Sequence, residues 1–234
     1  LFIAPFSTAF PQEILWEIGT SDNSTAEFML APGGYGNFKT DVIYYVGISE
    51  PAADWPYVHP GPADGWAGNR PHTFMVLFNL EKVPSEGSGK LILDLVDTHG
   101  HLPPRLKIEI NQKSSERRTR AGSGSDASVS GSPDQGKESI IEVTFPADVL
   151  REGENTVAIT TTSGSWALYD SLRLEAPAGT ALAKTTLPVL QMGKPEAPPL
   201  LVEREDKLWQ VLRVPVRHYG EGTDAEVRVD GGPP

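Results

Sequence analysis

The chain of 234 residues has 31 acidic and 20 basic side chains, so its formal net charge is −11 and most of its surface would repel the phosphates of a nucleic acid. Its 23 glycines and 21 prolines favour many turns between short strands and argue against a helical bundle. It has no cysteine, which excludes disulfides and thiol chemistry.

Residues 1–12 are expected to form a lead segment before the first domain. Residues 1–10 are mildly apolar, but they lack a basic start and are interrupted by Pro5, so they do not form an intact signal peptide. No apolar stretch of about 18 residues occurs further along the chain. We therefore expect no membrane span and no membrane partner.

Alternation of apolar and polar side chains predicts a series of antiparallel strands. Half-buried strands are expected at residues 105–111, 141–145, 156–161 and 168–174. Further strands with longer apolar runs or tyrosines are expected at residues 42–48, 74–80 and 91–96. A short helical turn is expected between Pro146 and Gly153, which suit the start and the end of a helix. These elements predict an all-β fold.

Two long loops separate these strands. Residues 50–71 are rich in Pro, Gly and aromatic side chains, and residues 113–138 are rich in Ser and Gly. The second loop has almost no apolar residue larger than alanine, so we expect a mobile excursion on the surface.

The composition changes after the last of these strands. Residues 178–200 are rich in Ala, Pro and Thr and predict a semi-extended linker. Residues 209–219 and 225–230 then alternate like two strands, which cannot bury a core by themselves. Residues 201–234 are therefore expected to be a partial second β-domain or C-terminal strands.

Several motifs occur in order between residues 13 and 177. They are ILWEIGTSDNSTAEF from Ile14, VIYYVG from Val42, the pair Asp54-Trp55, the strand at residues 73–80, FPADVLREGENT from Phe145 and LYDSLRLE from Leu168. In sequence and spacing they resemble the C-terminal β-sandwich, the third domain, of family-four polysaccharide lyases, which are rhamnogalacturonan lyases.

The resemblance implies a galactose-binding-like jelly-roll sandwich over residues 13–177 that binds carbohydrate, often with a structural calcium ion. The family's catalytic lysine and histidine belong to a separate N-terminal domain that nothing here matches, so the resemblance argues against lyase activity. We expect a non-catalytic module of a secreted, periplasmic or cell-surface polysaccharide-degrading enzyme. Its partners would be a plant cell-wall glycan, pectic or related, and the catalytic domain of the same polypeptide. The alternative is a spacer sandwich that packs against a catalytic domain and binds no sugar.

The loop at residues 50–71 supplies the candidate sugar-binding side chains. Flat aromatic rings pack against the C–H groups of a sugar, while polar neighbours bond its hydroxyls. The candidates are Trp55, Tyr57, His59, Trp66, Asn69 and Arg70. The alternative for the aromatic members is that they pack the long loop onto the sandwich.

Asp170 stands in an otherwise apolar row of leucines in the expected strand at residues 168–174. A buried carboxylate is costly unless it is hydrogen-bonded or coordinated. Asp170 is therefore expected either to accept hydrogen bonds as a structural group or to bind calcium with help from Asp22 or Glu27.

Asp97, His99 and His101 place a carboxylate and two imidazoles within five residues, which is a plausible half-site for a transition metal. A metal-dependent enzyme that uses this turn is a further hypothesis. Short clusters of this kind are common in solvated turns, and no other histidine stands at a motif spacing from them.

Overall fold

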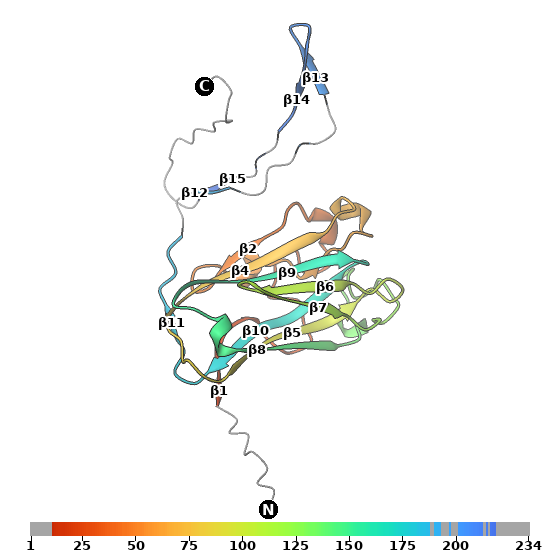
Figure 1. Ribbon diagram of the computed structural model, residues 1–234. Coiled ribbons are helices and arrows are strands. Elements are labelled where there is room, and N and C mark those ends of the chain that lie inside the picture. The colour runs from red at the N-terminus through yellow and green to blue at the C-terminus, as the bar shows by residue number, and fades with distance from the viewer. Residues whose placement is uncertain are drawn as a thin grey trace, which may run out of the picture. The chain divides into compact units, whose positions relative to one another are not determined.

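The computed structural model describes residues 11–187, 190–192, 197, 201–212, 214 and 216–218. The chain divides into two compact units, residues 1–185 and 186–234. Two sheets face each other in the first unit (Figure 1). None of the helices in the described part of the chain is long and apolar enough to cross a membrane.

The first sheet has the strand order β1-β10-β5-β8, and the short β3 pairs with β10. Its strands are β1 (Gln12–Gly19), β3 (Val58–His59), β5 (Ser88–Thr98), β8 (Ser139–Pro146) and β10 (Ala167–Pro177). The second sheet has the order β11-β4-β9-β6-β7, and the short β2 runs parallel to β4. Its strands are β2 (Ile43–Tyr45), β4 (His72–Lys82), β6 (Arg105–Ile110), β7 (Lys113–Arg118), β9 (Gly153–Ser163) and β11 (Ala181–Ala183).

Strand β8 shows why these sequences form two-faced strands. Ile141, Val143 and Phe145 are buried between the sheets, whereas Glu142 and Thr144 between them are exposed. The same alternation packs core residues of both sheets against one another, including Phe74, Phe78, Leu91, Leu93, Val157 and Ile159. The all-β, jelly-roll antiparallel sandwich expected from the sequence is confirmed.

Other local expectations are confirmed in part. The helical turn after Pro146 is the 3₁₀ turn η4 (Ala147–Val149). The strand expected at residues 42–48 is shorter, because the chain turns after Tyr45, whose N–H donates to the hydroxyl of Ser49.

The expectation of a loop at residues 113–138 is wrong at its start. Residues 113–118 form β7, which pairs with β6 along its whole length. A polar strand can form here because β7 is the last strand of its sheet and its exposed side needs no apolar face. Further on, a 3₁₀ turn, η3 (Pro133–Gln135), precedes β8.

Residues 181–183 lie in the expected linker, yet they form β11, which pairs with β4 and belongs to the first unit. In the second unit, β12 (Leu190–Met192) pairs with β15 (Val216–His218), and β13 (Leu201–Arg204) pairs with β14 (Lys207–Gln210). The strand expected at residues 209–219 is thus divided between β14 and β15. The strand expected at residues 225–230 lies outside the described residues.

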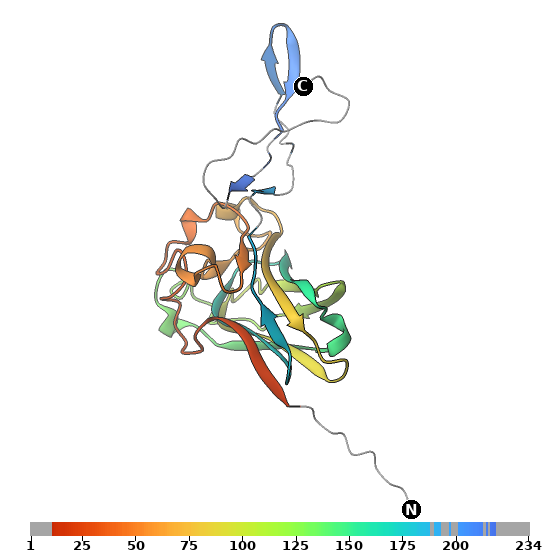
Figure 2. The same ribbon diagram turned by 90° about the vertical axis from the view of Figure 1, so that its left-hand side faces the viewer.

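The aromatic loop at residues 50–71 is folded onto the sandwich. It contains α1 (Pro51–Asp54), β3 and the 3₁₀ turn η2 (Gly65–Ala67), preceded by η1 (Tyr35–Asn37). Figure 2 shows the orange segments between β2 and β4 coiled compactly beside the strands. Trp55, Tyr57 and His59 have 0% exposed surface, so their predicted role in sugar binding is wrong and the alternative, packing of the loop onto the sandwich, holds for them. They pack the loop onto the core.

Trp55 is expected to be a major stabilising residue. Its ring meets those of Phe74 and Tyr169 edge-on, with centroids 5.3 Å away in each case. Trp55→Ala should lower the free energy of unfolding by about 3–5 kcal/mol, because it leaves a cavity in the core. Urea denaturation followed by circular dichroism measures this. The control is Trp209→Ala, since Trp209 is 56% exposed and should matter by less than about 0.5 kcal/mol. Equal stability of the two variants would contradict the assignment.

Candidate functional site

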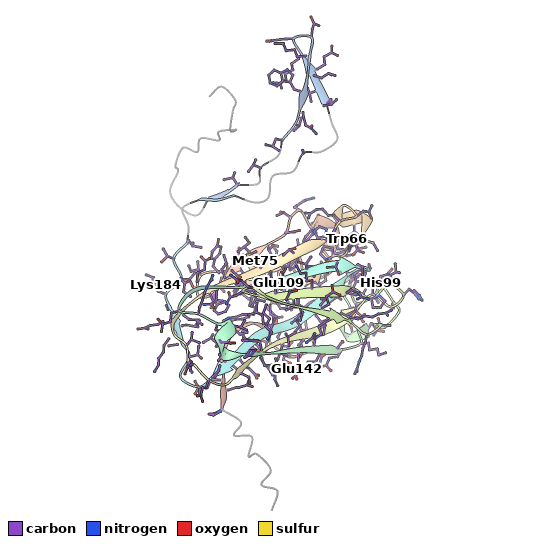
Figure 3. All side chains as sticks on the ribbon, in the orientation of Figure 1. Trp66, Met75, His99, Glu109, Glu142 and Lys184 are labelled. Carbon is purple, nitrogen blue, oxygen red and sulfur yellow. The ribbon has the colours of Figure 1, made fainter. Side chains whose placement is uncertain are left out.

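A pocket of about 230 Å³ lies where β5 ends and β10 begins. Four rings line it, those of Tyr35, Trp66, His99 and Trp166. Its polar lining comes from Asp64, Asp126 and Ser165. Trp66 and His99 lie at the same end of the sandwich, away from Lys184 (Figure 3). We call this site the end pocket.

Ring packing fixes the aromatic wall of the end pocket. Tyr35 meets Trp66 edge-on, with ring centroids 5.2 Å apart, and Phe38 meets Trp66 from a second side at 6.3 Å. His99 meets Trp166 in the same edge-on manner at 5.6 Å. Trp66 is only partly buried, so part of its ring remains available to a ligand.

His99 is held in one orientation by its own turn. Its Nδ1 accepts the backbone N–H groups of His101 and Leu102, at 3.2 and 2.9 Å, and the backbone N–H of His99 donates to the carbonyl of Trp166. An Nδ1 that accepts hydrogen bonds leaves the ring proton on Nε2. His99, which belongs to the pocket lining, therefore has a single ring N–H donor, at Nε2.

The two acids of the end pocket differ in burial and in hydrogen bonding. Asp64 is buried, and its carboxylate accepts the hydroxyl of Ser165 and the N–H of Gly61. Burial raises the pKa of Asp64 above its usual value, although these hydrogen bonds and the nearby histidines act in the opposite direction. Asp126 is exposed at the pocket wall. Asp64 thus shapes the pocket, and Asp126 is free to meet a ligand.

A hydrogen-bonded network of charged side chains holds the 3₁₀ turn η2, which carries Trp66 and which we call the Trp66 turn. His72 is buried, with Nδ1 2.6 Å from Asp41 Oδ1 and Nε2 3.1 Å from the carbonyl of Ala67. Asp41 also accepts the N–H of Thr73 and pairs with Arg70 at 3.3 Å. Burial opposes ionisation of Asp41, but these hydrogen bonds and positive charges prevail and hold its pKa below its usual value.

The turn at Asp97, His99 and His101 is not a metal site. Asp97 is fully buried, and its carboxylate accepts the N–H groups of Thr98 and Ser123 and the hydroxyls of Ser123 and Ser128. It is therefore already satisfied, and it anchors the segment that carries Asp126. Within the described residues, no three His, Cys, Asp or Glu side chains converge to hold a metal ion.

The predicted sugar-binding residues divide into three groups. Trp66 lines the end pocket as expected. Arg70 and the exposed Asn69 follow it in the chain, and Arg70 is engaged by Asp41. Trp55, Tyr57 and His59 lie in the core, where they cannot contact a sugar. The sequence hypothesis missed Tyr35, Trp166 and Asp126, which arrive from segments distant in the chain, and assigned His99 a different role.

The predicted group of Asp22, Glu27 and Asp170 does not assemble. Asp22 and Glu27 are engaged locally, Asp22 by the N–H of Ser24 and Glu27 by that of Thr20. Asp170 is fully buried, and its Oδ1 accepts the N–H groups of Asp22 and Ser24, at 3.3 and 3.1 Å.

Asp94 is an acidic side chain whose charge affects Asp170. Asp94 is also buried and accepts the hydroxyl of Ser21 at 2.7 Å. Burial raises the pKa of Asp170, backbone N–H groups of residues 22–24 lower it, and the charge of Asp94 raises it further. Oδ1 of Asp94 and Oδ2 of Asp170 are buried without a hydrogen-bond partner among the described residues.

Comparison with known proteins gives one family match. The family model "CBM-like: Polysaccharide lyase family 4, domain III" matches residues 14–174. No curated protein matches the sequence.

Solved structures with a similar fold include carbohydrate-binding modules and part of a larger enzyme. A CBM35 from Cellvibrio japonicus Abf62 is 14% identical, with 77% of this chain and 96% of that chain covered and a TM-score of 0.34. Xyl-CBM35, in complex with a disaccharide that contains glucuronic acid, is 13% identical, with 78% and 98% covered and a TM-score of 0.33. The GH115 4-O-methyl-α-glucuronidase BtGH115A, specific for decorated arabinogalactans, is 13% identical at a TM-score of 0.37. The match covers 74% of this chain but only 19% of the glucuronidase.

The jelly-roll sandwich and the family match define a carbohydrate-binding-module-like domain. The matched residues extend from β1 into β10 and include strands of both sheets, but not β11. The chain belongs to the CBM-like family of domain III of polysaccharide lyase family 4.

Asp41→Asn should show how far the charged network stabilises the Trp66 turn. Because the pKa of Asp41 is lowered in the folded state, its contribution is present above the unfolded value of about 4 and is lost as the pH falls through the folded value. Near neutral pH the variant should be less stable by about 1–3 kcal/mol, since a buried hydrogen-bonding group loses a charged partner.

Thermal melts of wild type and Asp41→Asn between pH 7 and pH 2.5 provide the measurement. The stability difference should shrink as the pH falls below about 4. A difference that is constant over this range would show that the ionised form of Asp41 has no special role.

Proposed function

We propose that this chain is a non-catalytic module that binds a plant cell-wall glycan, pectic or related, in the end pocket. It would serve a secreted, periplasmic or cell-surface polysaccharide-degrading enzyme whose catalytic domain belongs to the same polypeptide. The observation that carries the proposal is the end pocket itself. It combines a partly exposed tryptophan with fixed polar groups at one end of a sandwich of the carbohydrate-binding-module-like class.

The chemistry of the end pocket supports a sugar ligand. The ring of Trp66 offers a flat apolar face for sugar C–H groups, and exposed Leu102 extends the apolar rim. The N–H of His99 and the carboxylate of Asp126 offer a donor and an acceptor to hydroxyl groups. Both polar groups are held on anchored turns, so little order is lost when they bind.

The same pocket supports a role without catalysis. Glycoside hydrolysis normally uses two carboxyl groups that flank the scissile bond. Among the described residues of the end pocket, Asp64 is buried and engaged by Ser165 and Gly61, which leaves Asp126 as the exposed carboxylate. One free carboxylate suits a hydrogen bond to a ligand better than a two-carboxylate mechanism.

A structural calcium ion is part of the proposal. Two buried carboxylates with unpartnered oxygens, on Asp94 and Asp170, fit a hard cation that prefers oxygen ligands. Calcium would neutralise the two charges there and join β5 and β10 to the turn at residues 21–24. Without it, burial and the nearby charge of Asp94 favour the protonated form of Asp170, which is why the pKa of Asp170 is raised.

Trp66→Ala tests the ligand site. Loss of a stacking platform should weaken binding of a pectic oligosaccharide by several-fold, corresponding to about 0.5–1.5 kcal/mol, while the fold is retained. Isothermal titration against a panel of pectic oligosaccharides gives the affinity, and chromatography of the recovered sugar should show no cleavage. The control is Trp209→Ala in the second unit. If the wild-type chain binds none of the panel, the spacer function replaces the proposal.

Removal of calcium tests Asp94 and Asp170. Chelation at pH 7 should lower the melting temperature, because no cation then offsets the repulsion between the two buried carboxylates. The effect should be smaller at pH 4.5, because the raised pKa of Asp170 favours its neutral form as the pH falls. Asp170→Asn should abolish the response to chelator, whereas Asp148→Asn, an exposed acid elsewhere, should leave it intact. A melt that chelator leaves unchanged at both pH values would refute the calcium site.

A further inference from the structure

A cluster of three arginines lies at one margin of the sandwich, and none of them lines the end pocket. Arg117, Arg118 and Arg120 line a groove of about 200 Å³ with residues 139–142 of β8. β7 is the last strand of one sheet and β8 the last strand of the other, so the groove lies between two sheet margins (Figure 1). We call it the arginine groove.

The pairing of β7 with β6 places the charged side chain of Arg117 at the margin of the core. Arg117 lies opposite Leu106, and Ser115 lies opposite Ile108. Leu106 and Ile108 face the core, so Arg117 is on the core-facing side of β7, at the margin where the groove opens. Charged residues on an edge strand also block pairing with other chains, which is the simplest alternative role for this cluster.

A role in blocking edge pairing does not by itself explain why the arginines lack acidic partners among the described residues. Glu142, which lines the groove, and Glu116 of β7 are paired with other cations. Glu116 pairs with Arg105, and Glu142 pairs with Lys90, each at 3.4 Å. No ion pair engages Arg118 or Arg120 in this part of the chain. On a protein of net charge −11, unneutralised guanidinium groups favour an external anion.

The backbone that carries these arginines is fixed. Thr119 is buried, and both its N–H and its hydroxyl donate to the carbonyl of Pro104, at 3.2 and 3.0 Å. The carbonyl of Arg120 accepts the hydroxyl of Thr98 at 2.6 Å. Arg118 and Arg120 therefore extend from an anchored segment, which lowers the entropic cost of holding a ligand.

We propose that the arginine groove is a second ligand site, which binds the carboxylate of a uronate residue in an acidic oligosaccharide. The planar guanidinium of arginine pairs with a carboxylate through two parallel hydrogen bonds. Ile140, 56% exposed beside the arginines, offers an apolar surface to the sugar ring. A densely charged polyanion is disfavoured by the acidic remainder of the chain. The choice of an oligosaccharide as the ligand rests on the proposed function.

The test measures two ligands separately on the full chain. Trigalacturonate supplies carboxylates, and galactotriose is the neutral comparison. The double variant Arg118→Gln and Arg120→Gln should weaken trigalacturonate binding about tenfold at low salt, with galactotriose binding unchanged, because two carboxylate contacts are lost. The matched control is Lys113→Gln with Arg151→Gln, which removes the same charge from a different surface groove and should leave both affinities nearly unchanged.

Each outcome supports or overturns the arginine groove. Equal losses in the two double variants would show a general charge effect, and loss of trigalacturonate binding only in Trp66→Ala would place uronates in the end pocket. Competition by hexa-aspartate as strong as by trigalacturonate, or no binding of trigalacturonate by the wild type, would also overturn it. Failure of the proposed function can be distinguished from failure of the arginine groove. If the end pocket binds no sugar, galactotriose binding is absent or insensitive to Trp66→Ala, while the arginine variants still weaken the binding of trigalacturonate.

Discussion

The buried imidazole of His59 connects the two sheets at the end that carries the pocket. It stacks on Phe74 of β4, with ring centroids 3.8 Å apart, and its Nδ1 lies 2.9 Å from the hydroxyl of Tyr169 in β10. Its Nε2 reaches the carbonyl of His72 at 3.0 Å. Burial lowers its pKa to about 4, so the ring is neutral near pH 7 and can accept from the tyrosine while it donates to the carbonyl. The loop that precedes Trp66 is therefore tied to both sheets.

Alternation along the chain was sufficient to predict the central strands, because burial of one face is a property that each strand's own sequence records. Strand β8 illustrates this with its regular change between buried and exposed side chains. Strands β7 and β11 were missed for the opposite reason. They lie at sheet margins or add a short segment to an existing strand, and their pairing partners, not their own side chains, determine that they are extended.

The candidate site was predictable only in part, since its residues meet through tertiary structure. The loop composition identified Trp66, but it gave the same weight to Trp55, which is fully buried. Exposure of a ring depends on what packs against it, and Phe74 and Tyr169 come from strands on opposite sheets. The apolar row around Asp170 did signal a buried carboxylate that needs partners. Its neighbour Asp94 could not be found without the register of β5 against β10.

Strand β4 has eleven residues, and two short segments cover its outer margin. β2 pairs with residues 75–77, and β11 pairs with residues 79–82, where the side chain of Asn79 also reaches the carbonyl of Lys184. The family match ends at residue 174, before β11 begins. A recombinant fragment trimmed to that boundary would leave residues 79–82 with unpaired N–H and C=O groups. Exposed strand margins recruit other chains, so aggregation of such a fragment would reflect the choice of boundary and not an unstable sandwich.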